Sequence, residues 1–215
     1  MAHDSREVNL PGIMARDKVS ETSKKLSWLL RHGAGEAGLR MDAAGWASVD
    51  DVLRKIHMDM DTLLRAVAEN NKARIELQDG RIRACQGHST EGMPVTCEAL
   101  EATWARHEGA GPLWHGTSTD AVPSILREGI RSIGRTHVHL AEATDSKVGK
   151  RAQVDVLIEV SVSGLQAAGL GVFQSSNGVV LVRHVPPACI TGLVPQTRAG
   201  RARQGELTAL LQARP

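Results

Sequence analysis

The sequence predicts an α+β protein in which an α-rich N-terminal lobe precedes a β-rich second lobe. Three observations support this prediction. Apolar residues recur at helical spacing before residue 70, an Asp79-Gly80 pair separates two alternating runs, and the clearest period-two pattern covers residues 154–162. The chain has 215 residues, of which 41% are hydrophobic, so it can bury a core. With one Phe and no Tyr, that core must be mainly aliphatic.

Three helices are expected in the first lobe. The first runs from about Arg16 to His32, and Gly33 is a suitable C-terminal stop. The second begins after Ser48, whose hydroxyl can cap it, and Asp51 three residues later resembles the second half of a capping box. The third covers Met60–Glu69 and turns its aliphatic residues inward.

A β-hairpin is expected after the third helix. Residues 75–78 alternate between apolar and polar side chains, Asp79-Gly80 favours a tight turn, and residues 82–84 alternate on the return. Three helices followed by a hairpin is the order of a winged helix. That fold often binds nucleic acid, although a fold alone does not establish a function.

The second lobe is expected to be richer in strands. A connection over Gly92–Gly111, with a short helix around Trp104, leads into it. The elements expected there are a strand at 113–115, a helix at 119–128 ended by Gly129, strands at 137–140 and 154–162, an Asn177-Gly178 turn into a strand at 179–182, and a helix at 205–214. We therefore divide the chain into a flexible N-terminus (1–15), a winged-helix lobe (16–95) and a second lobe (96–215).

Composition argues against several classes of protein. The three cysteines, Cys85, Cys97 and Cys189, lack CxxC spacing, which disfavours a disulfide framework or a zinc site and fits a reducing cytoplasm. No apolar stretch reaches transmembrane length, and the N-terminus lacks a signal-peptide core. We therefore expect a cytoplasmic monomer with no membrane partner.

Basic residues in the first lobe are candidate phosphate ligands. Arg31-His32 ends the first helix and combines a bidentate cation with a side chain that titrates near neutral pH. Cations at a helix C-terminus also simply complement the helix dipole, and for the dipeptide alone that interpretation is favoured. Arg74 opens the hairpin, where a lone arginine would by default be a surface charge. The segment from Arg83 to Ser89 gathers polar groups at a strand end.

The second lobe contributes two further motifs. His115-Gly116-Thr117 follows a strand, and the glycine allows a ligand to approach the backbone closely. Alternation along a strand would turn Arg135, His137 and His139 to one face. Two histidines at that spacing are also compatible with a metal, but no further ligand stands close by in sequence, so we expect none.

Taken together, these motifs resemble those of the tRNA 2'-phosphotransferase family, which removes RNA 2'-phosphates with NAD. They follow the family's order over residues 20 to about 195, and together they are specific. The matching segments are 23–32 (SKKLSWLLRH), 45–46 (GW), 70–74 (NNKAR), 86–89 (QGHS), 113–117 (LWHGT), 135–140 (RTHVHL) and 175–179 (SSNGV). Ile75 and Val180 stand where the family often has aromatic residues.

The resemblance implies a fold and a set of site residues. It implies a winged-helix RNA lobe and an ADP-ribosyltransferase-like NAD lobe, with a catalytic set of Arg31, His32, Arg74 and Arg135. On this basis we expect His115, Gly116 and Thr117 to hold NAD, with weaker contributions from His139, Ser175 and Asn177. We expect Lys72, Arg83 and Gln86 to contact the RNA.

The resemblance also implies a two-step reaction. The RNA 2'-phosphate attacks the ribose carbon that carries nicotinamide, giving an ADP-ribosylated RNA phosphate. The ribose 2″-hydroxyl then attacks the phosphorus, which yields 2'-OH RNA and ADP-ribose 1″,2″-cyclic phosphate. The arginines would clamp the phosphate, and His32 would handle a proton in the second step. A 2'-phosphorylated RNA, such as a tRNA, and NAD are the expected partners.

Three alternative functions remain open at this point. The same clamp would serve ADP-ribosylation of terminal nucleic-acid phosphates. The H-x-T sequences at His88 and His115 are compatible with a two-histidine phosphodiesterase, although their spacing is short and Arg31-His32 would go unexplained. A winged-helix regulator without enzymatic activity would explain the helices and the hairpin, but not the basic motifs in both lobes.

Overall fold

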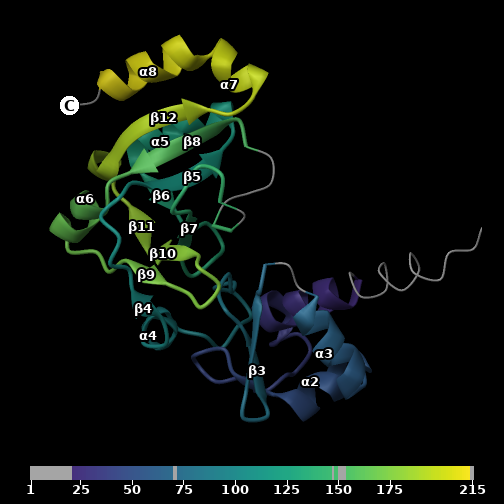
Figure 1. Cartoon of the computed structure of the whole chain (residues 1–215). Coiled ribbons are helices and arrows are strands. Elements are labelled where there is room, and N and C mark those ends of the chain that lie inside the picture. The colour runs from purple at the N-terminus through teal and green to yellow at the C-terminus, as the bar shows by residue number, and fades with distance from the viewer. Residues whose placement is uncertain (1–20, 70–71, 147, 150–153, 214–215) are drawn as a thin grey trace, which may run out of the picture.

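The protein has an α+β fold, as the sequence predicts (Figure 1). The computed structural model describes residues 21–69, 72–146, 148–149 and 154–213. The expected flexible N-terminus at 1–15 and the start of the first helix therefore lie outside the described residues. Within the described residues, helices accompany four small sheets whose strand pairs are all antiparallel.

The N-terminal part of the described chain contains the expected three helical segments and hairpin. The first helix covers residues 21–28 and continues into a wider π-type turn. A short additional strand pairs with the hairpin, so the sheet has three strands in the order β1-β3-β2. The elements are η1 (Leu29–Gly33), β1 (Ala47–Ser48), α2 (Val49–Ile56), α3 (Met60–Ala68), β2 (Ile75–Gln78) and β3 (Arg81–Ala84).

Two details of helix termination differ from the sequence prediction. Ser48 occupies the N-cap position of α2, but its side chain makes no capping hydrogen bond, and Asp51 pairs instead with Arg54 on the exposed face. The capping-box prediction is therefore wrong. The first helix does end at Gly33, but the residue after it has ordinary helical angles. A Cβ at Gly33 would lie 2.4 Å from the ring of Trp28, so a larger residue there would displace that ring.

The second part of the chain is richer in strands. Its sheets have the orders β4-β9-β10-β7, β11-β6 and β12-β8-β5, and α7 and α8 follow β12 at one end of the molecule (Figure 1). The elements are α4 (Cys97–Glu101), β4 (Ala105–Arg106), β5 (Leu113–Thr117), η2 (Thr119–Ala121), α5 (Val122–Glu128), β6 (Ile130–Arg131), β7 (Val138–Leu140), β8 (Val156–Val160), α6 (Val162–Ala167), β9 (Phe173–Gln174), β10 (Val180–Val182), β11 (His184–Val185), η3 (Pro187–Cys189), β12 (Ile190–Pro195), α7 (Arg198–Ala202) and α8 (Gln204–Gln212).

Two elements of this part differ from their predicted form. The short helix expected around Trp104 is α4, which ends at Glu101, and Trp104 follows it in a loop with its side chain buried. The strand predicted at 154–162 is shorter, and Val162 already begins α6. Leu157, on the polar phase of the pattern, is also fully buried, so β8 is covered on both faces as well as paired on both edges by β5 and β12.

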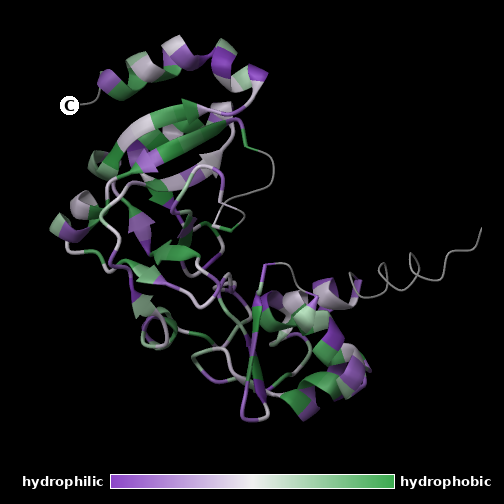
Figure 2. Cartoon of the chain, in the orientation of Figure 1, coloured by the Kyte–Doolittle hydropathy of each residue, from purple (hydrophilic) through white to green (hydrophobic). Residues whose placement is uncertain are grey.

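The hydrophobic core consists of three clusters. One lies among the helices and the sheet of residues 26–93, a second fills the large strand-rich part, and a third joins Leu100, Trp104, Phe173, Val179 and Leu181. In Figure 2 the most hydrophobic ribbon lies along the central strands, including β8 and β10. No helix in the described ranges is long and apolar enough to cross a bilayer.

Candidate active site

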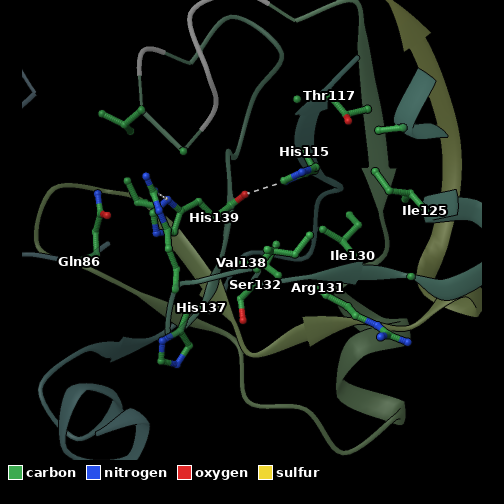
Figure 3. A pocket seen from close by; sticks show the side chains of 18 of the residues that line it. Gln86, His115, Thr117, Ile125, Ile130, Arg131, Ser132, His137, Val138 and His139 are labelled. Carbon is green, nitrogen blue, oxygen red and sulfur yellow. Dashed lines mark hydrogen bonds between the residues drawn. The ribbon is translucent and has the colours of Figure 1, made fainter. Parts of the chain in front are cut away.

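One cavity of about 540 Å³ collects most of the residues that the sequence singles out (Figure 3). Its lining comes from both parts of the chain. The predicted residues along it are Arg31, Lys72, Arg74, Gln86, His115, Gly116, Thr117, Arg135, His139 and Asn177. Three predicted residues, His32, Arg83 and Ser175, are not in the cavity lining. The volume lies within the range usual for small-molecule sites.

Arg31 is a cation of the cavity whose charge is both buried and close to other charges. It projects from the π-type turn η1, and its Nε and Nη2 are buried with no hydrogen-bond partner among the described residues. Burial, followed by the charges of Arg74 and Arg135, lowers the pKa of Arg31 to about 10. The guanidinium therefore remains charged at neutral pH, desolvated and close to two like charges.

Arg74 reaches the cavity from the segment before β2, where the backbone is held in an unusual conformation. Ala73 has a φ of 42°, in the left-handed region that alanine seldom adopts. Cys85 fixes this segment, since its N–H donates to the Arg74 carbonyl at 2.9 Å and its Sγ donates to the Ala73 carbonyl at 3.1 Å. The neighbouring strand β3 thus sets the position of Arg74.

The segment 86–89 links Arg31 to Arg135. The N–H of Ser89 donates to the Arg31 carbonyl at 2.8 Å, and Ser89 forms an isolated antiparallel bridge with Arg135. The Ser89 hydroxyl also contacts Nδ1 of His32 at 2.7 Å. Burial lowers the pKa of His32, and Arg135 and Arg31 lower it further. His32 is therefore a neutral imidazole at neutral pH, held beside the cavity.

Gly87 lies between Arg31 and His139. A Cβ built there would be in ordinary van der Waals contact with both, at 3.5 Å from the Arg31 guanidinium and 3.5 Å from the His139 ring. The glycine is required by its backbone conformation, since its φ of +89° is one that other residues rarely adopt.

His115 and Thr117 line the cavity from β5. The Nδ1 of His115 donates to the carbonyl of His139 at 3.1 Å, which joins β5 to β7 (Figure 3). Gly116 between them also lines the cavity, and its lack of a side chain serves a neighbour within the protein. A Cβ at Gly116 would lie 2.4 Å from Cγ1 of Val154, so in this structure the glycine makes room for a side chain of the protein.

Ser175 and Asn177 form a turn that joins the two parts of the chain. The Ser175 hydroxyl is buried and donates to Oδ1 of Asn177 at 2.9 Å and to the Val179 carbonyl at 3.1 Å. The Asn177 amide donates to the Lys72 carbonyl at 2.9 Å. This geometry does not support the expectation that Ser175 contacts NAD, whereas Asn177 does reach the cavity.

Arg83 lies in the interior, where the expectation was an RNA contact. It is 5% exposed, and its guanidinium donates to Oε2 of Glu76 at 2.7 and 2.9 Å and to the Thr103 hydroxyl at 2.8 Å. It also stacks over the ring of Trp46 at 4.5 Å from the centroid. A side chain with these partners has no surface to offer to RNA, so the structure does not support that expectation.

His137 and His139 do not share one face as the alternation predicts, because β7 begins only at Val138. The Nε2 of His137 contacts Oε1 of Glu101 at 3.0 Å, and its ring packs edge-on against Trp104 at 4.9 Å. His139 instead lies beside Arg135, with 3.4 Å between Nη1 and Nδ1. The two histidines thus have separate partners.

The far half of the cavity was not predicted from the sequence. It is formed around Ile125 of α5 and around Ile130 and Arg131 of β6 (Figure 3). The sequence carries one signal for this half, the closely spaced arginines Arg127, Arg131 and Arg135. Of these, Arg131 and Arg135 line the cavity, whereas Arg127 pairs with Glu128. The spacing of the three arginines does not show which of them reach the cavity, because α5 ends between Arg127 and Arg131.

Comparison with known proteins agrees with this arrangement. Residues 17–184 match the model of the family described as "RNA 2'-phosphotransferase, Tpt1 / KptA family". The chain is 39% identical to a protein of Pseudomonas savastanoi pv. phaseolicola over 84% of this chain and 97% of the relative. It is 37% identical to a protein of Pyrobaculum aerophilum over 80% of each chain. Both relatives are named "Probable RNA 2'-phosphotransferase". The chain therefore belongs to the RNA 2'-phosphotransferase, Tpt1 / KptA family.

Proposed function

We propose that the protein is an NAD-dependent RNA 2'-phosphotransferase. The observation that carries this proposal is the convergence of Arg31, Arg74 and Arg135 from three separate segments on one cavity. Like charges repel, and burial penalises Arg31 further, so the arrangement costs stability unless an anion occupies it. An anion such as an RNA 2'-phosphate, gripped by planar guanidinium groups, satisfies that requirement.

The two lobes have different roles in this proposal. Residues 16–95 form a winged-helix lobe that holds the RNA, with Lys72 and Gln86 at the cavity as its contacts. Residues 96–215 form an ADP-ribosyltransferase-like lobe that binds NAD through His115 and Thr117 of β5, with Asn177 nearby. In support, the cavity draws its lining from both lobes, so two substrates bound one to each lobe would meet within it.

The residues fit a first step in which the phosphate is the nucleophile. NAD supplies an electrophilic ribose carbon and a leaving group, nicotinamide, which departs with the electrons of its bond to the ribose. The protein needs only to hold a phosphate oxygen in line with that carbon. Arg31, Arg74 and Arg135 fix the phosphate, and the buried donors of Arg31 replace the water that the anion loses.

In the second step, a ribose hydroxyl attacks the phosphorus and the RNA 2'-oxygen leaves. The hydroxyl loses a proton and the departing oxygen gains one. His32 is suited to this transfer, because it is neutral at neutral pH and the Ser89 hydroxyl holds its ring at Nδ1. Arg74 and Arg135 stabilise the charge that builds on the phosphoryl oxygens.

The test is incubation of the protein with a 2'-phosphorylated RNA oligonucleotide, with and without NAD, followed by analysis of the products. We expect 2'-OH RNA, nicotinamide and ADP-ribose 1″,2″-cyclic phosphate only when NAD is present. Arg135→Ala should abolish turnover, and turnover like that of the wild type would contradict the clamp. His32→Ala should accumulate ADP-ribosylated RNA, whereas complete loss of the first step would argue against a role confined to the second.

Two control substrates separate the alternatives. An oligonucleotide with only a 5'-phosphate tests terminal ADP-ribosylation. A 2',3'-cyclic phosphate without NAD tests a phosphodiesterase. Binding of duplex DNA with no turnover of any substrate would instead favour a regulator.

A further inference from the structure

His139 lies among the clamp arginines rather than with the predicted NAD contacts on β5. Its Nδ1 is 3.4 Å from Nη1 of Arg135, and its ring and the Arg31 guanidinium each lie 3.5 Å from the position that a Cβ of Gly87 would take. The backbone carbonyl of His139, in contrast, accepts a hydrogen bond from His115 (Figure 3). The side chain of His139 therefore contacts Arg135, whereas its main chain contacts His115.

The arginine contact fixes which nitrogen of His139 carries the proton. A guanidinium can only donate, so Nδ1 must accept and is unprotonated. In the neutral imidazole the proton is then on Nε2. That atom is buried, with no hydrogen-bond partner among the described residues. His139 thus presents an N–H donor that lacks an acceptor.

The unused donor belongs to a group of unpartnered atoms. Nε and Nη2 of Arg31 are also buried donors without acceptors, and Oε1 of Gln86 is a buried acceptor without a donor. All three residues line the same cavity. A buried donor without a partner costs free energy, and the unpartnered donors of Arg31 and His139 indicate that a ligand rich in acceptors supplies their missing partners.

An uncharged donor is physically well suited to this position. Three guanidinium groups already repel one another there, and a fourth cation would raise that cost. Burial, then Arg135 and Arg31, lower the pKa of His139 to about 3, so the ring stays neutral under physiological conditions. It can add a directional hydrogen bond without adding charge.

We propose that His139 donates a hydrogen bond from Nε2 to the RNA 2'-phosphate, as an uncharged donor beside Arg31 and Arg135. This inference rests on the proposed function, and it moves His139 from the NAD contacts to the phosphate contacts. The donor acts on substrate binding in both steps and takes no part in proton transfer, which remains with His32.

The test compares binding of two oligonucleotides without NAD, one with an internal 2'-phosphate and one identical but with a 2'-hydroxyl. His139→Phe keeps a buried ring but removes the N–H, and His139→Gln keeps an amide donor. A hydrogen bond to a charged group corresponds to roughly 10- to 100-fold in affinity. We expect His139→Phe to weaken binding of the 2'-phosphorylated oligonucleotide by about that factor, and His139→Gln to retain most of it. His184→Phe, at an exposed histidine of β11, is the matched control.

Several outcomes would overturn the inference. They are an unchanged preference for the 2'-phosphate in His139→Phe, equal losses in both variants, or a raised KM for NAD with phosphate binding intact. If His139→Phe fails to fold, ¹⁵N spectroscopy of the wild-type imidazole decides. A proton on Nε2 that responds to added inorganic phosphate supports the donor, and a proton on Nδ1 refutes it. If the wild-type protein binds the two oligonucleotides equally well, the proposed function is contradicted. The ¹⁵N spectrum of the imidazole tests the role of His139 separately from that result.

Discussion

Replacing Arg31 with methionine should make the protein more stable and inactive. The charged guanidinium is desolvated and lies near Arg74 and Arg135, which together hold its pKa at about 10, more than two pKa units below its ordinary value. At roughly 1.4 kcal/mol per pKa unit, the folded protein bears a cost of about 3 kcal/mol for this charge. The charge of Arg31 lowers stability. At pH 7 the group is charged in both the folded and the unfolded state, and only in the folded state is it desolvated and close to like charges.

Methionine keeps the unbranched apolar stem and removes the charge and the unpartnered N–H groups. We expect Arg31→Met to raise the free energy of unfolding by about 1–3 kcal/mol, which corresponds to roughly 2–10 °C in Tm for a domain of this size. Turnover should be lost. The wild type should gain Tm on addition of inorganic phosphate, and the variant should gain much less.

Thermal and urea unfolding of both proteins, with and without phosphate, provides the measurement. Arg74→Met is the matched control, since Arg74 is half-buried and its guanidinium is not among the unpartnered buried groups. That variant should lose activity without a comparable gain in stability. If Arg31→Met is less stable than the wild type, the desolvated charge of Arg31 does not destabilise the folded protein, and the prediction is refuted.

Three further predictions concern the surroundings of the clamp. Ser89→Ala should lower kcat about tenfold and leave the Tm nearly unchanged, because it frees the ring of His32, the proposed proton-transfer residue; an unchanged kcat would contradict this role. Arg83→Ala should destabilise the fold by about 3 kcal/mol because it leaves Glu76 unpaired, and adding Glu76→Gln should recover part of that loss in urea unfolding. Burial holds the pKa values of His88 and His139 near 3, so protons bind the unfolded chain preferentially and stability should fall by about 3 kcal/mol per pH unit between pH 6 and 4. Denaturation series at several pH values should show this slope reduced in His139→Phe.

Local patterns were sufficient to predict the fold class and most elements. The Asp79-Gly80 hairpin and the helix α3 depend on residues close in sequence, and both are present. The errors concern features that a local periodicity does not specify. Leu157 is buried on its polar phase, so both faces of β8 are covered, and Gly33 lies against the Trp28 ring instead of adopting a left-handed helix cap. Neither fact can be predicted from the spacing of apolar residues, whether that spacing follows the two-residue period of a strand or the 3.6-residue period of a helix.

The same limitation applies to the site, and the pair Arg31 and Arg83 shows why. Both are arginines of the first lobe, and both belong to motifs that the sequence singles out. Arg83 pairs with Glu76 across the hairpin, donates to the Thr103 hydroxyl and stacks on the ring of Trp46. The protein itself therefore neutralises its charge. Arg31 has no such partners for its buried Nε and Nη2. A buried cation that the fold has paired maintains structure, whereas one left unpaired indicates an anionic substrate, and only the folded arrangement distinguishes the two.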